Sequence, residues 1–340
     1  MKSRCMLQYG SQITLVVTVK ILFIAPNRLG DAILASGLIE QCRRRYPGAQ
    51  FTVACGPVAA PLFQALPGLV EILVLRKSSG WRRWRHWADL LAVGWGQYWG
   101  LVVDMRGSAS ALVLPTRRRR IWRGGKPDQH RVMALSGFLD PSDATPPAPH
   151  VWLSAAHHAQ AAAIIGDDPR PILALAPTAN WIGKIWPIER FVAVAKALTA
   201  HDGPLAAGRI LVAGGPAERA AALPLIKAFD SDDVIDLVDR TDLLTLAACI
   251  GKAELFIGND SGLMHLSAAV GTTTLGLFGP SRDDHYRPWG DDNMAVRSAQ
   301  TYAALMPGGQ PQAHDICLMT GLSVAAVTTA ARAQLSAVSA

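Results

Sequence analysis

The stretch KILFIAPNRLGDAILASGLIEQCRRRYPG, residues 20 to 48, carries the pattern that sets the fold. An apolar run, KILFIAP, is followed by the polar turn NRLGD and then by apolar residues at helical spacing that stop at Pro47-Gly48. A fully apolar strand followed by a helix is typical of a parallel sheet that is covered on both faces. We therefore expect an α/β protein that begins with this strand and helix.

The same alternation of strand and helix continues along the chain in two series. Between them lies DPSDATPPAPH (140–150), a Pro- and Asp-rich stretch without periodicity that is typical of a connection between domains. We predict two facing, doubly wound, Rossmann-like domains over residues 1–150 and 151–340, with residues 1–18 as an extension outside the fold. The further strands that we expect are 50–56, 70–76 and 100–108 in the first domain, and 171–178, 208–216, 233–239, 254–260 and 272–281 in the second.

Length and composition agree with this division. A chain of 340 residues exceeds the roughly 100 to 200 residues of one typical domain. Half of the residues are hydrophobic (50%) and only 17% are charged, which excludes a disordered chain. The net charge of +7 favours an anionic partner, which could be nucleic acid, a phosphorylated small molecule or a membrane surface.

The cysteines and the N-terminus restrict the cellular context. The five cysteines are scattered without CxxC pairs, which indicates a reducing compartment and neither a disulfide framework nor a zinc site. The segment ITLVVTVKILFIA (13–25) superficially resembles a signal peptide, but Lys20 interrupts it and no small-residue cleavage site follows. Because no uninterrupted apolar stretch of about 20 residues occurs, we expect no membrane span.

Ligands of such sheets bind beyond the carboxyl ends of the strands, at helix N-termini. The stretch GNDSGLMHLSAAVG (258–271) is an expected strand-to-helix corner of this kind, whose N–H groups suit a diphosphate. Asp260 would then accept hydrogen bonds from ligand hydroxyls while Ser261 and Gly262 approach the phosphates. The alternative is that Asp260 or Ser261 only caps the helix, and that His265 is an ordinary helix residue.

Two further corners of the second series carry polar residues. PTANWIGKIWP places Lys184 in a loop before a helix, where it is either a diphosphate ligand or a solvated lysine. AGGPAE offers Gly214 and Gly215 for close backbone approach, and Glu218 for a ribose diol or merely for the helix dipole.

In the first series, NRLGD places Asp31 at the start of a helix, across the expected cleft from these loops. An aspartate near a helix N-terminus stays ionised and can accept a proton from a hydroxyl. It can equally be a first-turn acid that stabilises the helix.

Four motifs in order give the chain a family resemblance. ILFIAPNRLGDAILASGLIEQCRRRYPGA, VVDMRGS, KIWP and GNDSGLMHLSAAVGTTTLGLFGPS resemble, over roughly residues 20 to 290, the motifs of the family 9 glycosyltransferases, which include the ADP-heptose:lipopolysaccharide heptosyltransferases. The resemblance implies a GT-B fold, with the acceptor bound mainly by the first domain and the nucleotide-sugar by the second. It also implies inverting transfer with no metal and no cofactor, and ADP-heptose as the donor substrate. Asp239-Arg240 departs from the family, which often has a glycine there.

The resemblance also implies roles for single residues. Asp31 would be the catalytic base, Lys184 the phosphate-binding lysine, and the corner at Asp260 the donor site. The donor-binding residues that we predict are Thr178, Lys184, Gly214, Gly215, Glu218, Asp260, Ser261, Gly262 and His265. The acceptor-binding residues that we predict are Arg28, Asp104, Arg106, Arg117 and Arg118.

A basic and aromatic surface is expected outside these corners. WRRWRHW (81–87) spaces three tryptophans by three residues among arginines, and RRRR (117–120) adds charge. Tryptophan and arginine together suit the interface of an anionic membrane or a glycolipid. Nucleic acid uses the same chemistry, and a tryptophan stripe can also be core. We predict an anionic glycolipid acceptor, peripheral contact with the cytoplasmic face of the inner membrane, and no nucleic-acid partner.

Two other functions compete with a glycosyltransferase. A non-catalytic protein that binds nucleotide-sugars or polyanions could share the fold, but binding alone needs no base such as Asp31. A nucleotide-dependent oxidoreductase would carry GxGxxG after its first strand, where APNRLGD stands instead.

Overall fold

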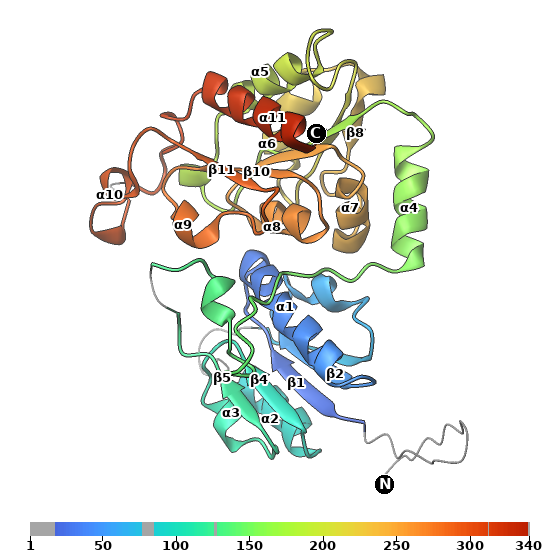
Figure 1. Cartoon of the computed structure of the whole chain (residues 1–340), viewed down its shortest axis with the longest axis vertical. Helices are drawn as coiled ribbons and strands as arrows, with labels where there is room; N and C mark the ends of the chain where they lie inside the picture. Colours follow the sequence, from blue (N-terminus) through green and yellow to red (C-terminus); the bar gives the residue numbers. More distant parts are fainter. Residues whose placement is uncertain (1–17, 77–84, 126–127, 312, 339–340) are drawn as a thin grey trace.

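The computed structural model describes residues 18–76, 85–125, 128–311 and 313–338, which form two α/β domains one above the other along the long axis of the molecule (Figure 1). Each domain contains one sheet in which every strand pair is parallel. The predicted pair of doubly wound parallel sheets is confirmed.

The sheet of the first domain has the strand order β3-β2-β1-β4-β5. Its strands are β1 (Lys20–Ile24), β2 (Gln50–Cys55), β3 (Leu69–Val74), β4 (Leu101–Asp104) and β5 (Arg119–Ile121). The helical elements between them are α1 (Leu29–Arg45), η1 (Ala60–Phe63), α2 (Arg85–Trp95) and α3 (Ser110–Val113). The direction of chain progression reverses between β1 and β4, which are neighbours although they are not consecutive.

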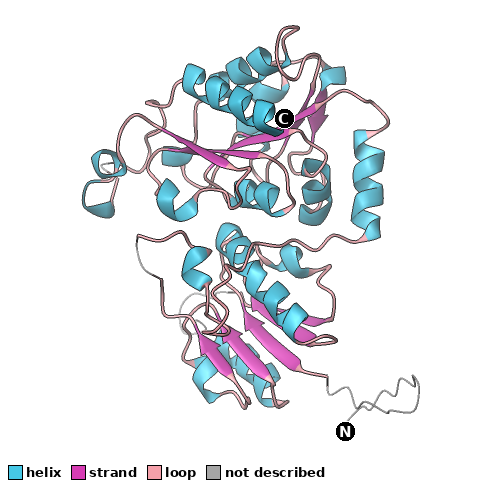
Figure 2. Cartoon of the chain, in the orientation of Figure 1, coloured by secondary structure: helices cyan, strands magenta, loops and turns pink. Residues whose placement is uncertain are grey.

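Strand β1 shows why this sheet needs helices on both faces. Successive side chains of a strand point to opposite faces. Ile21 and Phe23 pack in the cluster that contains α1, whereas Leu22 and Ile24 pack with residues of α2 and α3. Figure 2 shows helices on both sides of this sheet. All four side chains are fully buried.

The sheet of the second domain has the order β11-β10-β9-β6-β7-β8. Its strands are β6 (Ile172–Ala176), β7 (Arg209–Val212), β8 (Val234–Asp236), β9 (Leu255–Asn259), β10 (Thr274–Phe278) and β11 (Met294–Arg297). One face is covered by α5 (Ile188–Thr199), α6 (Arg219–Ile226) and α11 (Val324–Val338). The other face is covered by α4 (Ala155–Ile165), α7 (Leu243–Ile250) and α8 (Gly262–Ala269). Short helical elements are η4 (Ile182–Lys184), η5 (Ser231–Asp233), α9 (Asp283–Tyr286), α10 (Tyr302–Leu305) and η6 (Pro307–Gly309).

The connection between the domains begins after β5 and includes η3 (Met133–Leu135). It stays on the first domain as far as Trp152, which is buried in that core and whose Nε1 lies 3.4 Å from Glu40 Oε2. The next helix, α4, packs against α7 of the second domain. The chain therefore passes from one domain to the other between Trp152 and α4.

Several elements differ from the sequence expectation. Arg119 and Arg120, expected only as part of a basic surface, begin β5, a short edge strand whose three residues are all part-buried. The expected helix after β2 shrinks to η1, which contains Pro61 near its start and is followed by Pro67, and a proline further along ends a helix. Elements α4, β11 and α11 had no expected counterpart.

Two sequence expectations fall largely outside the described residues. Residues 1–17 of the expected extension are not described. Of the stretch WRRWRHW, only residues 85–87 are described, as the backbone at the start of α2.

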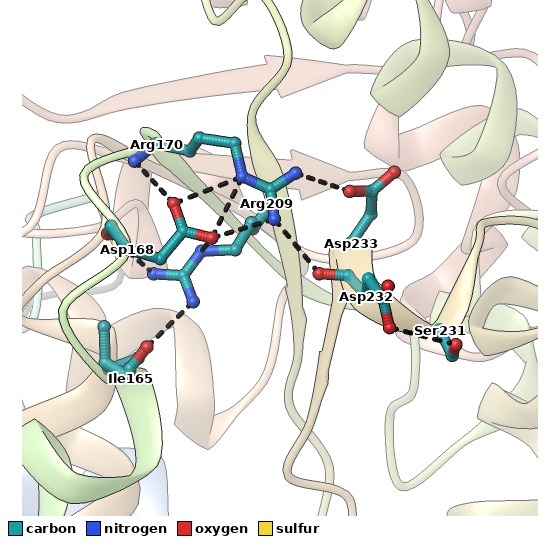
Figure 3. A network of polar contacts seen from close by, with 7 residues as sticks. All are labelled: Ile165, Asp168, Arg170, Arg209, Ser231, Asp232 and Asp233. Atoms are coloured by element: carbon teal, nitrogen blue, oxygen red, sulfur yellow. Dashed lines mark hydrogen bonds and ion pairs between the residues drawn. The ribbon is translucent and has the colours of Figure 1, made fainter.

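An ion-pair network ties the second sheet together at the amino ends of its strands (Figure 3). Arg170 binds both Asp168 (Nη2 to Oδ2, 2.8 Å) and Asp233 (Nη1 to Oδ1, 2.5 Å). Arg209, at the start of β7, donates to the carbonyl of Ile165 at the end of α4. Hydrogen bonds from Arg170 lower the pKa of Asp168 to about 2. Because ligands of such sheets bind at the opposite ends of the strands, we assign this network a structural role.

Among the described residues, no helix combines the length and apolar character needed to cross a membrane.

Candidate active site

The two domains meet where the start of α1 lies against the start of α8. A Cβ atom at Gly30 would lie 3.0 Å from Cδ2 of His265, and a Cβ atom at Gly262 would lie 3.0 Å from Cγ of Leu29. Both distances are tight for real side chains, so glycine at both positions permits this close approach. The NRLGD turn of the first domain therefore faces the NDSG corner of the second.

Both sheets place this contact at their topological switch points. The chain order reverses between β1 and β4 in the first sheet and between β6 and β9 in the second. Asp31 follows β1, Lys184 follows β6 and Asp260 follows β9. Crevices at switch points are where open parallel sheets bind ligands.

Lys184 and Asp260 form an ion pair, with 2.5 Å between Nζ and Oδ2. The side chain of Asp260 is only 8% exposed and that of Lys184 is 27% exposed, so the pair is largely shielded from water. This contact explains how a carboxylate can stand at a corner suited to anions: the lysine neutralises it and remains partly accessible to a ligand.

Ser261 begins α8 without capping it. Its backbone is extended (φ −148°, ψ 174°) and its side chain accepts no hydrogen bond from the first turn of the helix. Its buried Oγ atom has no hydrogen-bond partner among the described residues. The N-terminal N–H groups of α8 and this hydroxyl are thus donors that a bound anion could use.

Asn259 fastens the loops that carry these residues. Its Oδ1 accepts a hydrogen bond from the backbone N–H of Trp186 (3.0 Å), and its Nδ2 donates to the carbonyl of Pro177 (2.8 Å). The side chain is fully buried. Asn259 therefore joins the end of β9 to both sides of the Lys184 loop, a role that the sequence did not suggest beyond its place beside Asp260.

Glu218 is held by two predicted donor-site residues. Its Oε2 accepts hydrogen bonds from Thr178 Oγ1 (2.8 Å) and from the backbone N–H of Gly215 (2.6 Å). A Cβ atom at Gly214 would lie 3.4 Å from the same oxygen. The structure thus brings Thr178, Gly214, Gly215 and Glu218 together at the ends of β6 and β7.

His265 lies in the contact between the domains. It is 5% exposed, and its Nδ1 has no hydrogen-bond partner among the described residues. Burial lowers its pKa to about 4, so the imidazole is neutral near pH 7. It also lines a small pocket whose other walls are Leu34, Pro149, Ala268, Ala269 and Trp289.

Tyr286 of α9 lies within electrostatic reach of both predicted carboxylates. Burial raises the pKa of its phenol, the charges of Asp31 and Asp260 raise this pKa further, and Arg131 and Arg28 lower it. Asp31 itself is part-exposed in the first turn of α1. Tyr286 therefore lies near both Asp31 and Asp260, and no motif of the sequence indicated this.

Asp104 and Arg106 lie at the end of β4. Asp104 is fully buried, and its oxygens accept hydrogen bonds from the N–H of Arg106 (2.8 Å), the N–H of Ser108 (2.6 Å) and Ser108 Oγ (2.7 Å). The carboxylate thus shapes its own loop. Arg106 is half-buried, which lowers its pKa, and its position at the switch point leaves it on the cleft side.

Arg117 and Arg118 are not brought to this cleft. The N–H of Arg117 donates to the carbonyl of Trp99 (2.9 Å), ahead of β4, and both arginines are exposed near the amino ends of the strands. Their neighbours turn inward, because Arg119 donates to the carbonyl of Leu114 and Arg120 to that of Leu139.

A second contact between the domains was not expected from the sequence. The N–H of Arg131 donates to the carbonyl of His285 (3.0 Å). His130 bridges its own loop and the second domain, because Nδ1 accepts from the N–H of Val132 and Nε2 lies 2.9 Å from the carbonyl of Arg287. This segment lies in a region without periodicity, so pattern reasoning could not place it.

The described residues contain no group of three or more His, Cys, Asp and Glu side chains that could hold a metal ion.

Residues 100–307 match the family described as glycosyltransferase family 9 (heptosyltransferase). The chain is similar to the lipooligosaccharide heptosyltransferase 2 of Campylobacter jejuni, with 27% identity over 322 residues that cover 88% of this chain and 93% of that protein.

Two solved structures share the fold. A family 9 glycosyltransferase from Veillonella parvula superposes with a TM-score of 0.76 at 18% identity, covering 94% of this chain and 98% of that chain. The ADP-heptose heptosyltransferase II of E. coli superposes with a TM-score of 0.69 at 20% identity, covering 95% of this chain and 100% of that chain. The expected GT-B arrangement of two Rossmann-like domains is thereby confirmed.

Proposed function

The chain belongs to glycosyltransferase family 9, and from this premise we propose that it transfers a heptose from ADP-heptose to a hydroxyl of a lipopolysaccharide-core glycolipid. The names of its relatives support the sugar and the donor. The observation that carries the proposal is the contact between α1 and α8, which sets Asp31 opposite the Lys184–Asp260 corner.

The donor would bind to the second domain. Its diphosphate would lie at the start of α8, where Ser261 and Gly262 offer their N–H groups and Lys184 offers an ammonium with three donors. Glu218 would accept hydrogen bonds from a ribose diol, because its position is already fixed by Thr178 and Gly215. Asp260 would bind hydroxyls of the sugar while it shares Lys184 with the phosphates.

Transfer would proceed by one displacement. Asp31 removes the proton from the acceptor hydroxyl, and the oxygen forms a bond to the anomeric carbon. On the opposite face the bond from that carbon to the phosphate oxygen breaks, and ADP leaves with the electron pair. Lys184 and the N–H groups of α8 neutralise the departing charge, which removes the need for a metal ion. One displacement inverts the anomeric configuration.

The acceptor would bind on the first domain. Arg28 directly precedes α1, and Arg106 follows β4, so both stand on the cleft side of the first sheet. Two cations on this side of the sheet suit an acceptor that carries phosphate or carboxylate groups. An acceptor anchored in lipid would bring the protein to the cytoplasmic face of the inner membrane as a peripheral protein.

Isothermal titration with ADP-heptose, ADP and UDP-glucose tests the donor site. We expect Lys184→Ala to weaken ADP-heptose binding by about 10- to 100-fold, because a hydrogen bond to a charged group contributes about 1.5–3 kcal/mol. Lys252→Ala, which removes an exposed lysine of the same domain, serves as the control and should bind like the wild type. Equal binding by both variants would refute the assignment of Lys184.

Steady-state kinetics on the same proteins tests the base. Asp31→Asn should bind the donor with an unchanged Kd but lower kcat by about 100-fold or more. The anomeric configuration of the product, read by NMR, should be opposite to that of the donor, and chelating agents should leave the rate unchanged. A folded wild type that binds ADP-heptose and transfers to no glycolipid acceptor would favour the non-catalytic alternative.

A further inference from the structure

Four large apolar side chains are exposed together on the first domain. Trp95 ends α2 and is 63% exposed, Tyr98 follows it at 66%, and Leu112 and Val113 of α3 are 58% and 55% exposed. Trp95 Nε1 donates to the carbonyl of Val113 (3.1 Å), which joins the two helices at this point. We call these four residues the α2–α3 patch. Its exposure excludes the core role that tryptophan often has.

Exposed arginines lie at the border of the patch. Arg117 and Arg118 are exposed beside it, because the N–H of Arg117 donates to the carbonyl of Trp99 directly after Tyr98. The stretch 90–103 contains no charged residue, and the stretch 105–126 contains arginine and lysine but no acid. The patch is therefore apolar and aromatic at its centre and cationic at its border.

The patch lies away from the active site. Tyr98 precedes β4, and the N–H of Gly100 bonds to the carbonyl of Lys20 at the start of β1, so the patch stands near the amino ends of the strands. Asp31 follows the carboxyl end of β1. In Figure 1, α2 and α3 lie at the end of the first domain that is remote from the second domain. Neither donor binding nor proton removal by Asp31 explains why these apolar side chains are exposed.

We propose that the α2–α3 patch is the surface by which this protein rests on an anionic phospholipid bilayer. Tryptophan and tyrosine favour the boundary between headgroups and acyl chains, where one part of the ring is wet and the other apolar. On the bilayer, Leu112 and Val113 would bury further apolar area among the acyl chains. Arg117 and Arg118 would bind the lipid phosphates. A second copy of the chain is a poorer occupant, because a symmetric contact would bring the same arginines together.

This proposal rests on the proposed membrane contact and assigns that contact to one surface. It depends on the proposed acceptor only in the transfer assay. It also fixes an orientation. The five residues of β1 span about 17 Å at about 3.3 Å per residue, which would hold the cleft above the lipid headgroups. Such a height suits an acceptor whose reacting sugar stands beyond other sugars of the headgroup.

Flotation with vesicles tests the proposal. Wild-type protein should float with vesicles of phosphatidylethanolamine and phosphatidylglycerol and not with vesicles of phosphatidylcholine alone. The double variant Trp95→Ser/Tyr98→Ser should lower the bound fraction at least tenfold. Arg117→Glu/Arg118→Glu should abolish the preference for the anionic vesicles.

Matched variants control for lost area and lost charge. Val58→Ser/Val70→Ser removes two side chains of the same domain that are 64% and 62% exposed, and should float like the wild type. Lys227→Glu/Lys252→Glu changes the net charge equally on the second domain, and should keep the preference for anionic vesicles. Far-UV circular dichroism establishes that each variant is folded.

The outcomes separate this proposal from the proposed function. If the patch variants lose flotation but transfer normally to a delipidated, water-soluble acceptor, both proposals hold. If they lose flotation and even the wild type transfers to no acceptor, the patch proposal holds and the transferase proposal fails. Unchanged flotation of both patch variants overturns the patch proposal, as does a wild-type dimer in sedimentation velocity that Trp95→Ser/Tyr98→Ser converts to monomer.

Discussion

At the scale of single residues, the ion pair between Lys184 and Asp260 explains how an aspartate can occupy a corner that suits anions. A shielded carboxylate that loses its cation keeps a large cost of desolvation. Lys184→Ala would therefore remove the proposed phosphate ligand and also leave Asp260 without its ion-pair partner. The two effects act in the same direction, so the loss of donor affinity should be larger than for an exposed lysine.

His265 carries a prediction about pH. Burial lowers its pKa from 6.5 to about 4, so the unfolded chain binds this proton more readily than the folded chain. The free energy of unfolding should therefore fall as the pH drops from about 6.5 to about 4, by roughly 2 to 4 kcal/mol, and this contribution should level off below pH 4. Urea unfolding at a series of pH values measures it.

The variant His265→Gln isolates this contribution from that of the acids. If the wild type is the more stable protein near pH 7, its advantage in free energy of unfolding over His265→Gln should shrink as the pH falls from about 6.5 to about 4. Parallel curves would contradict a buried, neutral His265.

At the scale of elements, the Lys184 loop is positioned by a side chain from another strand. Asn259, at the end of β9, bonds to Trp186 and to Pro177, which lie on the two sides of that loop. Trp186 is itself fully buried and donates to the carbonyl of Leu322 (2.9 Å). The loop is thus held at the switch point by buried hydrogen bonds rather than by its own conformational preference.

Asn259→Ala tests this positioning. It leaves a buried N–H and a buried carbonyl without partners, which should lower the free energy of unfolding by about 2–4 kcal/mol. It should also weaken ADP-heptose binding by tenfold or more, because Lys184 loses its support. Asn293→Ala is the matched control, since Asn293 bonds in the same way to Thr274 and Trp289.

We expect urea unfolding to show a loss of stability in both variants and titration to show a loss of donor affinity in Asn259→Ala alone. Equal donor affinity in the two variants would mean that the loop keeps its position without Asn259.

At the scale of the whole molecule, the two domains share a core. Leu244, Ala247 and Leu266 of the second domain pack in the cluster that contains β1 and α1 of the first. The backbone N–H of Arg131, which donates to the carbonyl of His285, and the His130 side chain, whose Nε2 lies beside the carbonyl of Arg287, add a second contact. Burial of apolar surface across the boundary should couple the unfolding of the two domains.

Leu266→Ala tests this coupling. Its side chain is fully buried, so truncation should cost about 2–5 kcal/mol. Because that cost falls on the boundary, scanning calorimetry should resolve two transitions where the wild type shows one. Leu198→Ala, which is equally buried but lies in the core of the second domain alone, should lower stability without this split. One transition in both variants would argue against coupling through Leu266.

The strongly periodic parts of this chain could be predicted from the sequence. Strands such as KILFIAP and ELFIGND bury both faces, and the polar corners that follow them are fixed by chain order at the carboxyl edge of a parallel sheet. Local patterns of this kind depend on near neighbours in the chain. They sufficed for the two-domain architecture and for the placement of Asp31, Lys184 and Asp260 at the cleft.

Other features depend on contacts between residues far apart in the chain. The four arginines of RRRR divide into two pairs. Arg117 and Arg118 are exposed, whereas Arg119 and Arg120 turn inward because they donate to the carbonyl groups of Leu114 and Leu139. The pairing of Lys184 with Asp260 spans 76 residues, and Tyr286 reaches Asp31 only across the boundary between domains. No local spacing encodes such distances, because packing of the two sheets brings these groups together.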